Sequence, residues 1–354
     1  MKMKRILAVA LALAMGLSMI SCSQSTEGEE TQPQSTEEQV AEQPAKTPEE
    51  KPVEEPTEKT KVNLAALSGP TALGMLELLE QNEKGEAAND YQVTLATAPD
   101  EVVAKVVSGE LDIAAVPTNV AATLYNKTQG GVQLAALNTM GVLYIVEAGE
   151  SIQSVADLKG KTIYSTGQGS TPEYALNLVL EKNGLTVGED VTVVYKTDNS
   201  EIAPLLASGE AQVALLPQPF VTSVMGQNET LRDMTEEWDK ATDGASGLTM
   251  GCVVVRTEFA QQNKEALDLF LDEYERSVQT VTSVEGLEHA AQLAEQYNIV
   301  KAPVARKAIP ACNIVFVQGE QMQQIAGGFL EVLYQANPKS VGGKLPDANF
   351  YYNR

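Results

Sequence analysis

The feature that most constrains this chain is a segment that occurs twice, one hundred residues apart. Residues 108–119 have the sequence SGELDIAAVPTN, and residues 208–219 have the sequence SGEAQVALLPQP. Aligned without a gap, residues 61–117 match residues 161–217 at fourteen of fifty-seven positions. In each copy the Ser-Gly pair is typical of a helix end, and the apolar run after it is typical of a buried strand. We interpret the copies as two units with the same local structure.

Each copy alternates strands with helices. In the first copy we expect strands at 62–67, 92–96 and 113–116, with helices at 72–81 and 100–107. The second copy repeats this order, with strands at 161–165, 191–195 and 213–216 and helices at 172–183 and 201–207. Such alternation is the pattern of a parallel sheet, so the predicted fold class is α/β.

Polar residues follow the predicted strands, where open α/β sheets bind ligands. Both copies also carry Gly-x-Thr before a helix, at 69–71 and 169–171, and a helix start favours an anion or an electronegative atom. Ordinary capping of the helices is the alternative role for these hydroxyls. The candidate ligand-binding residues are Ser68, Gly69, Thr71, Thr118, Asn119, Asn138, Thr139, Ser165, Gly169, Ser170, Thr171, Gln218 and Thr249.

The predicted rim of this site lacks charge. No Arg or Lys falls on its loops, which favours a neutral or zwitterionic heteroaromatic solute over one held by a salt bridge. A stacking ring would suit such a solute, although core or surface packing is the more common role for each candidate. The candidate rings are Tyr144, Tyr164, Tyr174, Phe220 and Trp238.

The segments around the second copy predict how the chain is divided. Apolar strands at 142–146 and 248–255 would lead into and out of a second lobe and form a two-strand hinge. Residues 228–247 form a polar stretch, and helical patterns follow at 257–277, 284–297, 302–310 and 319–337. We expect these C-terminal helices to pack on the first copy, with the aromatic end of the tail docked. Lobe 1 would then comprise 61–145 and 248–354, and lobe 2 would comprise 146–247.

The N-terminus has the pattern of an export signal. A positive start is followed by an apolar run to Ile20, and residues 1–21 are too short for a comfortable membrane span. Residues 19–22, Met-Ile-Ser-Cys, resemble the lipobox of bacterial lipoproteins, which predicts lipidation of Cys22; secretion with a free Cys22 is the alternative. Residues 22–60 predict a disordered acidic tether, because residues 23–60 carry eleven Glu against three Lys and little that can be buried.

Composition excludes several function classes. The formal net charge is −23, and no basic patch is present, so we expect no nucleic-acid partner. Cys252 and Cys312 could pair or remain buried thiols, and the sequence does not decide between them. His289 is the only histidine and lies in a helical pattern, where a surface or packed role is favoured over catalysis. No Cys/His metal spacing exists, so we expect neither a metal site nor a cofactor.

With these features assembled, the chain resembles the solute-binding lipoproteins of ABC importers, which have the type II periplasmic-binding-protein fold. The most recognisable motif is Asp157-Leu-Lys-Gly-Lys161, at the entry to the second lobe, and the nearest branch is that for sulfonates, nitrate, taurine and thiamine-pyrimidine precursors. The resemblance covers about residues 61–340. It implies two lobes that close on a small polar solute, a permease of an ABC transporter as partner, and an extracytoplasmic protein held at the membrane by Cys22.

Two other functions remain open at this stage. Some relatives of this fold are enzymes of thiamine or menaquinone synthesis, although this chain lacks a His or Cys centre suited to catalysis. A lipoprotein scaffold with a closed cleft is the other alternative. The expected protein is a monomeric, non-enzymatic binding protein.

Overall fold

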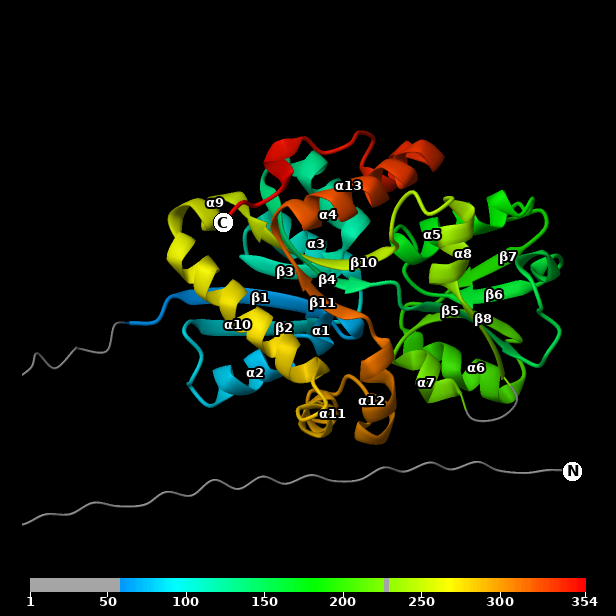
Figure 1. The fold of residues 1–354 in the computed structure, drawn as a ribbon, viewed down its shortest axis with the longest axis horizontal. Coiled ribbons are helices and arrows are strands. Elements are labelled where there is room, and N and C mark those ends of the chain that lie inside the picture. Colours follow the sequence, from blue (N-terminus) through cyan, green and yellow to red (C-terminus); the bar gives the residue numbers. More distant parts are fainter. Residues whose placement is uncertain (1–57, 226–228) are drawn as a thin grey trace, which may run out of the picture. The chain divides into compact units, whose positions relative to one another are not determined.

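The computed structural model describes residues 58–225 and 229–354, and all of these belong to one compact unit (Figure 1). The predicted signal peptide, Cys22 and nearly all of the predicted tether lie outside the described residues. The described residues form two sheets with helices on both faces of each. The strands of the first sheet, in spatial order, are β11 (Ile314–Val317), β4 (Val132–Met140), β10 (Thr249–Arg256), β3 (Ile113–Pro117), β1 (Lys61–Leu67) and β2 (Asp90–Ala96).

The second sheet repeats part of this arrangement. Its strands, in spatial order, are β7 (Thr192–Tyr195), β6 (Thr162–Ser165), β8 (Val213–Pro217), β5 (Leu143–Ala148) and β9 (Glu229–Asp233). In both sheets the first strand of a copy lies between the second and third strands of that copy and runs parallel to them. An antiparallel strand, β10 in one sheet and β5 in the other, then pairs with the third strand. The two copies therefore have the same topology, as the sequence repeat predicts.

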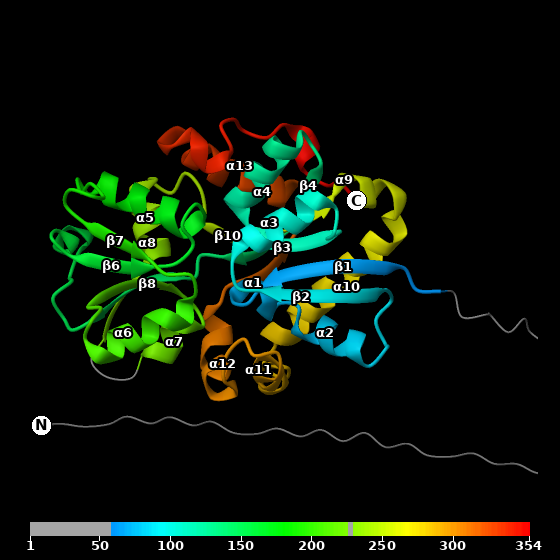
Figure 2. The ribbon, with the colours of Figure 1, turned by 180° about the vertical axis from the view of Figure 1, so that it is seen from behind.

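The helices lie on both sides of the sheets, as the two opposite views show (Figures 1 and 2). Among the described residues, no helix combines the length and apolar character needed to cross a membrane. The helices are α1 (Pro70–Leu73), α2 (Leu76–Glu83), α3 (Pro99–Ser108), α4 (Thr118–Thr128), α5 (Thr171–Lys182), α6 (Ile202–Ser208), α7 (Phe220–Val224), α8 (Met234–Ala241), α9 (Thr257–Gln262), α10 (Lys264–Thr282), α11 (Leu287–Gln296), α12 (Ala302–Ala308) and α13 (Gly319–Ala336).

The C-terminal helices pack on the first copy, as predicted. Glu273 on α10 accepts hydrogen bonds from the backbone N–H of Ala88 and the hydroxyl of Tyr91, both at 2.6 Å. Burial raises the pKa of Tyr91, so its hydroxyl remains a donor at neutral pH. The aromatic tail is docked as well, because Phe350 is fully buried and its ring lies 5.3 Å from that of Tyr125 on α4. Lobe 1 thus contains segments from both ends of the folded chain.

One local prediction was wrong. The single helix expected at 72–81 is broken into α1 and α2, with Gly74 between them. A side-chain carbon at Gly74 would lie 3.1 Å from both Ile314 and Tyr274, so the backbone approaches its neighbours closely here. The sequence made no structural prediction for the polar stretch before residue 248, whose residues 229–247 contain β9 and α8, with Trp238 on α8 fully buried. The buried side chain of Trp238 holds this segment against the core, which the polar composition of the segment did not indicate.

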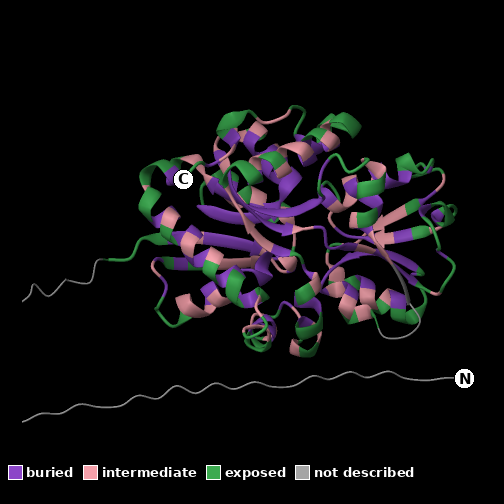
Figure 3. Ribbon diagram, viewed as in Figure 1, coloured by how far each residue is buried: buried purple, intermediate pink, exposed green. Residues whose placement is uncertain are grey.

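The chain passes between the sheets twice, once from β4 to β5 and once from α8 to β10. The strands predicted for these places form as β5 and β10, and each belongs to its own sheet. The buried residues are concentrated in the sheets and on the helix faces toward them (Figure 3). The fold is the two-lobed α/β architecture that the motifs predicted, while the residue boundaries given for the lobes stay a prediction.

Gly251 on β10 offers a test of the packing where the chain returns to the first sheet. A side-chain carbon there would lie 2.5 Å from Asn138 Oδ1 and 2.6 Å from Thr71 Cγ2. Gly251→Ala should therefore reduce the free energy of unfolding by about 1–3 kcal/mol, as measured by urea denaturation. Gly247→Ala is the control, because its nearest neighbour is the mobile end of Met140 at 3.4 Å. Equal stability of the two variants would contradict this packing.

Candidate functional site

A cavity of about 110 Å³ lies at the carboxyl ends of parallel strands from both sheets. This is the edge at which open α/β sheets bind ligands. The volume is small beside the roughly 300–1,000 Å³ of pockets for drug-sized ligands, so it suits a solute of few atoms. The cavity is lined by Leu67, Ser68, Gly69, Pro70, Thr71, Thr97, Pro99, Pro117, Leu143, Thr166, Gly167, Ser170, Pro172, Thr197, Asn199, Pro217 and Met250.

The lining residues come in pairs that are one hundred positions apart. Five such pairs face the same cavity, one member from each copy of the repeat. They are Leu67/Gly167, Pro70/Ser170, Thr97/Thr197, Pro99/Asn199 and Pro117/Pro217. The duplicated units therefore present equivalent loops to a shared space between them.

Helix starts position the polar side chains of the cavity. Ser170 is the N-cap residue of α5, and its hydroxyl donates a 2.6 Å hydrogen bond to the carbonyl of Gly167. Gly167 has a φ of +72°, and a side-chain carbon there would lie 2.7 Å from Ser170 Oγ. Glycine is thus required in this turn, which brings the backbone close to the cavity.

None of the residues that line the cavity is charged. Helices α3 and α5 begin at its wall, with Pro99 and Pro172 in their first turns. The free N–H groups and the dipole of a helix start carry partial positive charge. The cavity therefore offers hydroxyls and helix starts to an electronegative group, with no salt bridge.

Four of the thirteen predicted ligand residues line the cavity: Ser68, Gly69, Thr71 and Ser170. The structure places the other nine elsewhere. Gly169 is exposed and the remaining eight are buried. Gln218, for example, accepts hydrogen bonds from the hydroxyl and the backbone N–H of Thr222, at 2.8 and 3.2 Å, and so contacts the first turn of α7. These nine are Thr118, Asn119, Asn138, Thr139, Ser165, Gly169, Thr171, Gln218 and Thr249. Ligand contact by any of the thirteen residues stays a prediction.

Asn119 and Thr171 contact each other across the two lobes. The Thr171 hydroxyl donates to Asn119 Oδ1 at 3.2 Å, and Asn119 Nδ2 donates to the carbonyls of Gly169, at 3.3 Å, and Ser340, at 3.0 Å. Both side chains are fully buried. The sequence predicted that these two residues lie on the rim of the ligand site. In the structure they bond to each other and do not line the cavity.

Three further predicted residues have buried polar atoms without a hydrogen-bond partner among the described residues. These atoms are Thr118 Oγ1, Asn138 Nδ2 and Thr249 Oγ1. Thr118 follows the cavity-lining Pro117, and Thr249 precedes the cavity-lining Met250. Buried polar groups of this kind are uncommon because an unmade hydrogen bond costs about 1–3 kcal/mol. These three polar atoms lie behind the cavity wall and do not line it.

The five aromatic side chains proposed for stacking do not line the cavity. Trp238 packs instead against Phe329 of α13, with ring centroids 5.5 Å apart, and the Tyr164 ring lies 5.9 Å from Lys196 Nζ. Packing, the alternative role considered for these rings, therefore accounts for Trp238. The cavity offers no ring surface for a stacked solute.

Sequence reasoning missed Thr97, Thr166, Thr197 and Asn199 as residues of the cavity wall. A signal for two of them was present, because Thr97 and Thr197 are identical in the two copies and each follows a predicted strand. Asn199 had no such signal, since its counterpart in the first copy is Pro99.

The two cysteines of the described residues are unpaired and buried. Burial raises the pKa of the Cys252 thiol well above its usual range and that of Cys312 to about 12. Both thiols are therefore neutral at pH 7, and the question of a disulfide that the sequence left open is answered by free thiols.

Comparison with known proteins agrees with this geometry. Residues 77–238 match the family described as "ABC transporter, phosphonate, periplasmic substrate-binding protein". A protein of Brucella abortus (strain 2308), named only as a binding protein, is 27% identical over 144 residues. That alignment covers 41% of this chain and 43% of the relative, so the chain matches less than half the length of this relative.

Solved structures share the fold over most of the chain. An ABC transporter protein from Parabacteroides distasonis superposes with a TM-score of 0.68 at 26% identity, covering 84% of this chain and all of that one. The alkanesulfonate-binding protein SsuA of Xanthomonas axonopodis pv. citri, bound to MOPS, gives 0.61 at 13% identity and covers 82% and 96% of the two chains.

The nitrate-binding protein NrtA of Synechocystis PCC 6803 gives a TM-score of 0.54 at 14% identity and covers 70% and 69% of the two chains. At such identities the similarity to SsuA and NrtA shows the fold alone. In fold, and in the sequence of its central part, this chain resembles the periplasmic substrate-binding proteins of ABC transporters, as its motifs predicted.

Proposed function

We propose that this protein is the extracytoplasmic substrate-binding component of an ABC importer. It captures a small polar solute between its lobes and delivers the solute to the permease. The observation that carries this proposal is the cavity between the two copies, to which each contributes the same five positions. The family match over residues 77–238 supports the same role.

The composition of the cavity wall defines the solute class that we propose. A small polar molecule would place its electronegative group against the threonine hydroxyls and the starts of α3 and α5, because these are the polarised donors of the wall. A heteroaromatic solute, which the sequence favoured, would need to bind without stacking. The matched family includes phosphonate binders, so an oxyanion held by hydroxyls and backbone N–H groups also fits this class.

We also propose that the protein is held at the membrane by lipid on Cys22. The support for this comes from the sequence alone, namely the export signal and the Met-Ile-Ser-Cys motif. An anchored tether would keep the folded unit close to its permease, which raises the effective concentration of the pair.

The two paired threonines give the sharpest test of the solute site. Native mass spectrometry of the purified protein identifies the solute that it retains, and calorimetry then measures its affinity. Thr97→Val and Thr197→Val should each weaken binding about two- to tenfold, since each removes one hydroxyl while preserving shape. Thr192→Val, at an exposed position on β7, is the matched control. Unchanged affinity in both cavity variants would place the solute elsewhere, and turnover of the solute would show an enzyme.

Lobe closure can be tested through Asn119, whose side chain joins the lobes without lining the cavity. Asn119→Ala should raise the dissociation constant of the retained solute about 5- to 150-fold, because a lost coupling of about 1–3 kcal/mol favours the open form. Asn126→Ala is the matched control on the same helix. Its Nδ2 donates only to the carbonyls of Val341 and Lys344, within lobe 1. An equal loss of affinity in both variants would mean that stability, rather than closure, is affected.

The proposed anchor predicts a change of location on substitution of Cys22. Cys22→Ser should move the protein from the membrane fraction to the soluble fraction in a bacterial host that processes lipoproteins, because no thiol remains to carry the lipid. Immunoblots of the two fractions measure this shift. Release of both Cys22→Ser and the unsubstituted protein into the soluble fraction would refute lipid anchoring.

A further inference from the structure

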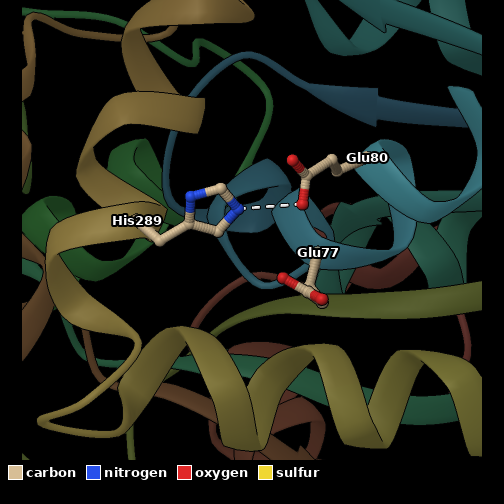
Figure 4. Close-up of side chains that lie close together, drawn as sticks. All are labelled: Glu77, Glu80 and His289. Atoms are coloured by element: carbon tan, nitrogen blue, oxygen red, sulfur yellow. Dashed lines mark hydrogen bonds and ion pairs between the residues drawn. The ribbon is translucent and has the colours of Figure 1, made fainter. Parts of the chain in front are cut away.

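Three side chains with metal-binding atoms meet on the surface of lobe 1, apart from the cavity. They are Glu77 and Glu80 on α2 and His289 on α11 (Figure 4). One ligand atom of each residue lies within 4.8 Å of the other two. Glu80 Oε2 is 2.8 Å from His289 Nε2. A carboxylate pair and an imidazole thus converge from two separate helices.

The helices, rather than mobile loops, hold these three residues together. Glu77 and Glu80 are three residues apart, so they lie on the same face of α2. Helix α11 packs against that helix, with Leu79 and Ala290 in the same buried cluster. Gln296 near the end of α11 also donates a 3.2 Å hydrogen bond to Glu83 of α2. The spacing of the three ligand atoms is therefore set by packed secondary structure.

The geometry and the donor set fit a zinc ion. Zinc binds histidine nitrogen and carboxylate oxygen at about 2.0–2.2 Å in tetrahedral sites, which places the donor atoms about 3.4 Å from one another. The separations here, from 2.8 Å to less than 4.8 Å, bracket that value. Calcium and magnesium prefer sites made of oxygen alone. We propose that Glu77, Glu80 and His289 bind one Zn²⁺, with water as the fourth ligand.

The positive charge of Lys84 should weaken zinc binding at this site, and this effect can be measured. Its ammonium group lies 2.9 Å from Glu80 Oε1, on the carboxylate oxygen that His289 does not contact. A zinc ion would compete with this cation for the charge of Glu80. Because the Lys84 side chain is 51% exposed, it can swing into solvent when the ion binds. Removal of its charge should therefore strengthen binding, an effect that a merely structural ion pair would not produce.

Zinc at this place would link α2 with α11, the helix in which sequence reasoning expected only a packed or exposed histidine. None of the three ligands lines the solute cavity. Zinc binding and solute binding should therefore be separable, and this inference does not depend on the proposed solute.

Calorimetric titration of the purified protein, free of any histidine tag and stripped with chelator, with zinc chloride tests the proposal. We expect one zinc ion per chain and a rise of the melting temperature with zinc concentration, because the ion binds the folded state. His289→Gln and Glu77→Gln should each weaken binding at least tenfold, since even outer-shell partners of a metal contribute that much. Lys84→Gln should bind more tightly than the unsubstituted protein.

Glu83→Gln is the matched control, because Glu83 lies on α2 and bonds to α11 without belonging to the triad. It should bind zinc with the affinity of the unsubstituted protein. Melting curves recorded without zinc establish that each variant is folded. The proposal is overturned if the unsubstituted protein binds no zinc, or if folded His289→Gln retains full affinity.

Discussion

The buried side chain of Asn119 is the polar junction on which the relation of the two lobes depends. Its amide reaches Gly169 and Thr171 at the start of α5 in one direction and the Ser340 carbonyl of the C-terminal segment in another. Around it the apolar core is continuous, and the contact of Trp238 with Phe329 belongs to the same cluster. A fully buried amide with three partners fixes one arrangement, because each partner lost leaves an unsatisfied group.

The cavity is a direct consequence of this arrangement. When the two copies face each other, the carboxyl ends of their parallel strands meet, and so do the helix starts that follow. Residues one hundred positions apart then line one space, for example Thr97 and its counterpart Thr197 in the sequence repeat. Apolar residues make up most of this wall, its polar groups are hydroxyls, one amide and helix starts, and charged side chains are absent from it. Such a wall selects a solute by hydrogen bonds and size, which is consistent with transport of a small polar molecule.

Much of the fold was predictable because its signals are local. The ends of α3 and α6 coincide with Gly109 and Gly209, both left-handed, as the Ser-Gly pattern indicated. The site was predictable only in outline. Ser68, Gly69, Thr71 and Ser170 line the cavity, but Asn119 and Thr171 turn toward each other. Whether a side chain at a strand end faces the cavity or bonds to another residue depends on how the two lobes pack together. The spacing of residues along the chain does not determine that packing.

The sequence by itself determined the α/β units, their duplication and their likeness to substrate-binding proteins, because periodicity and turn residues act over a few positions. Tertiary structure decided which hydroxyls face the cavity, since residues far apart compete for the same buried partners. It also brought Glu77 and Glu80 to His289, more than two hundred residues away. Metal-ligand spacing along the chain could not reveal that triad, because only the packing of α11 on α2 creates the short distances between its ligand atoms.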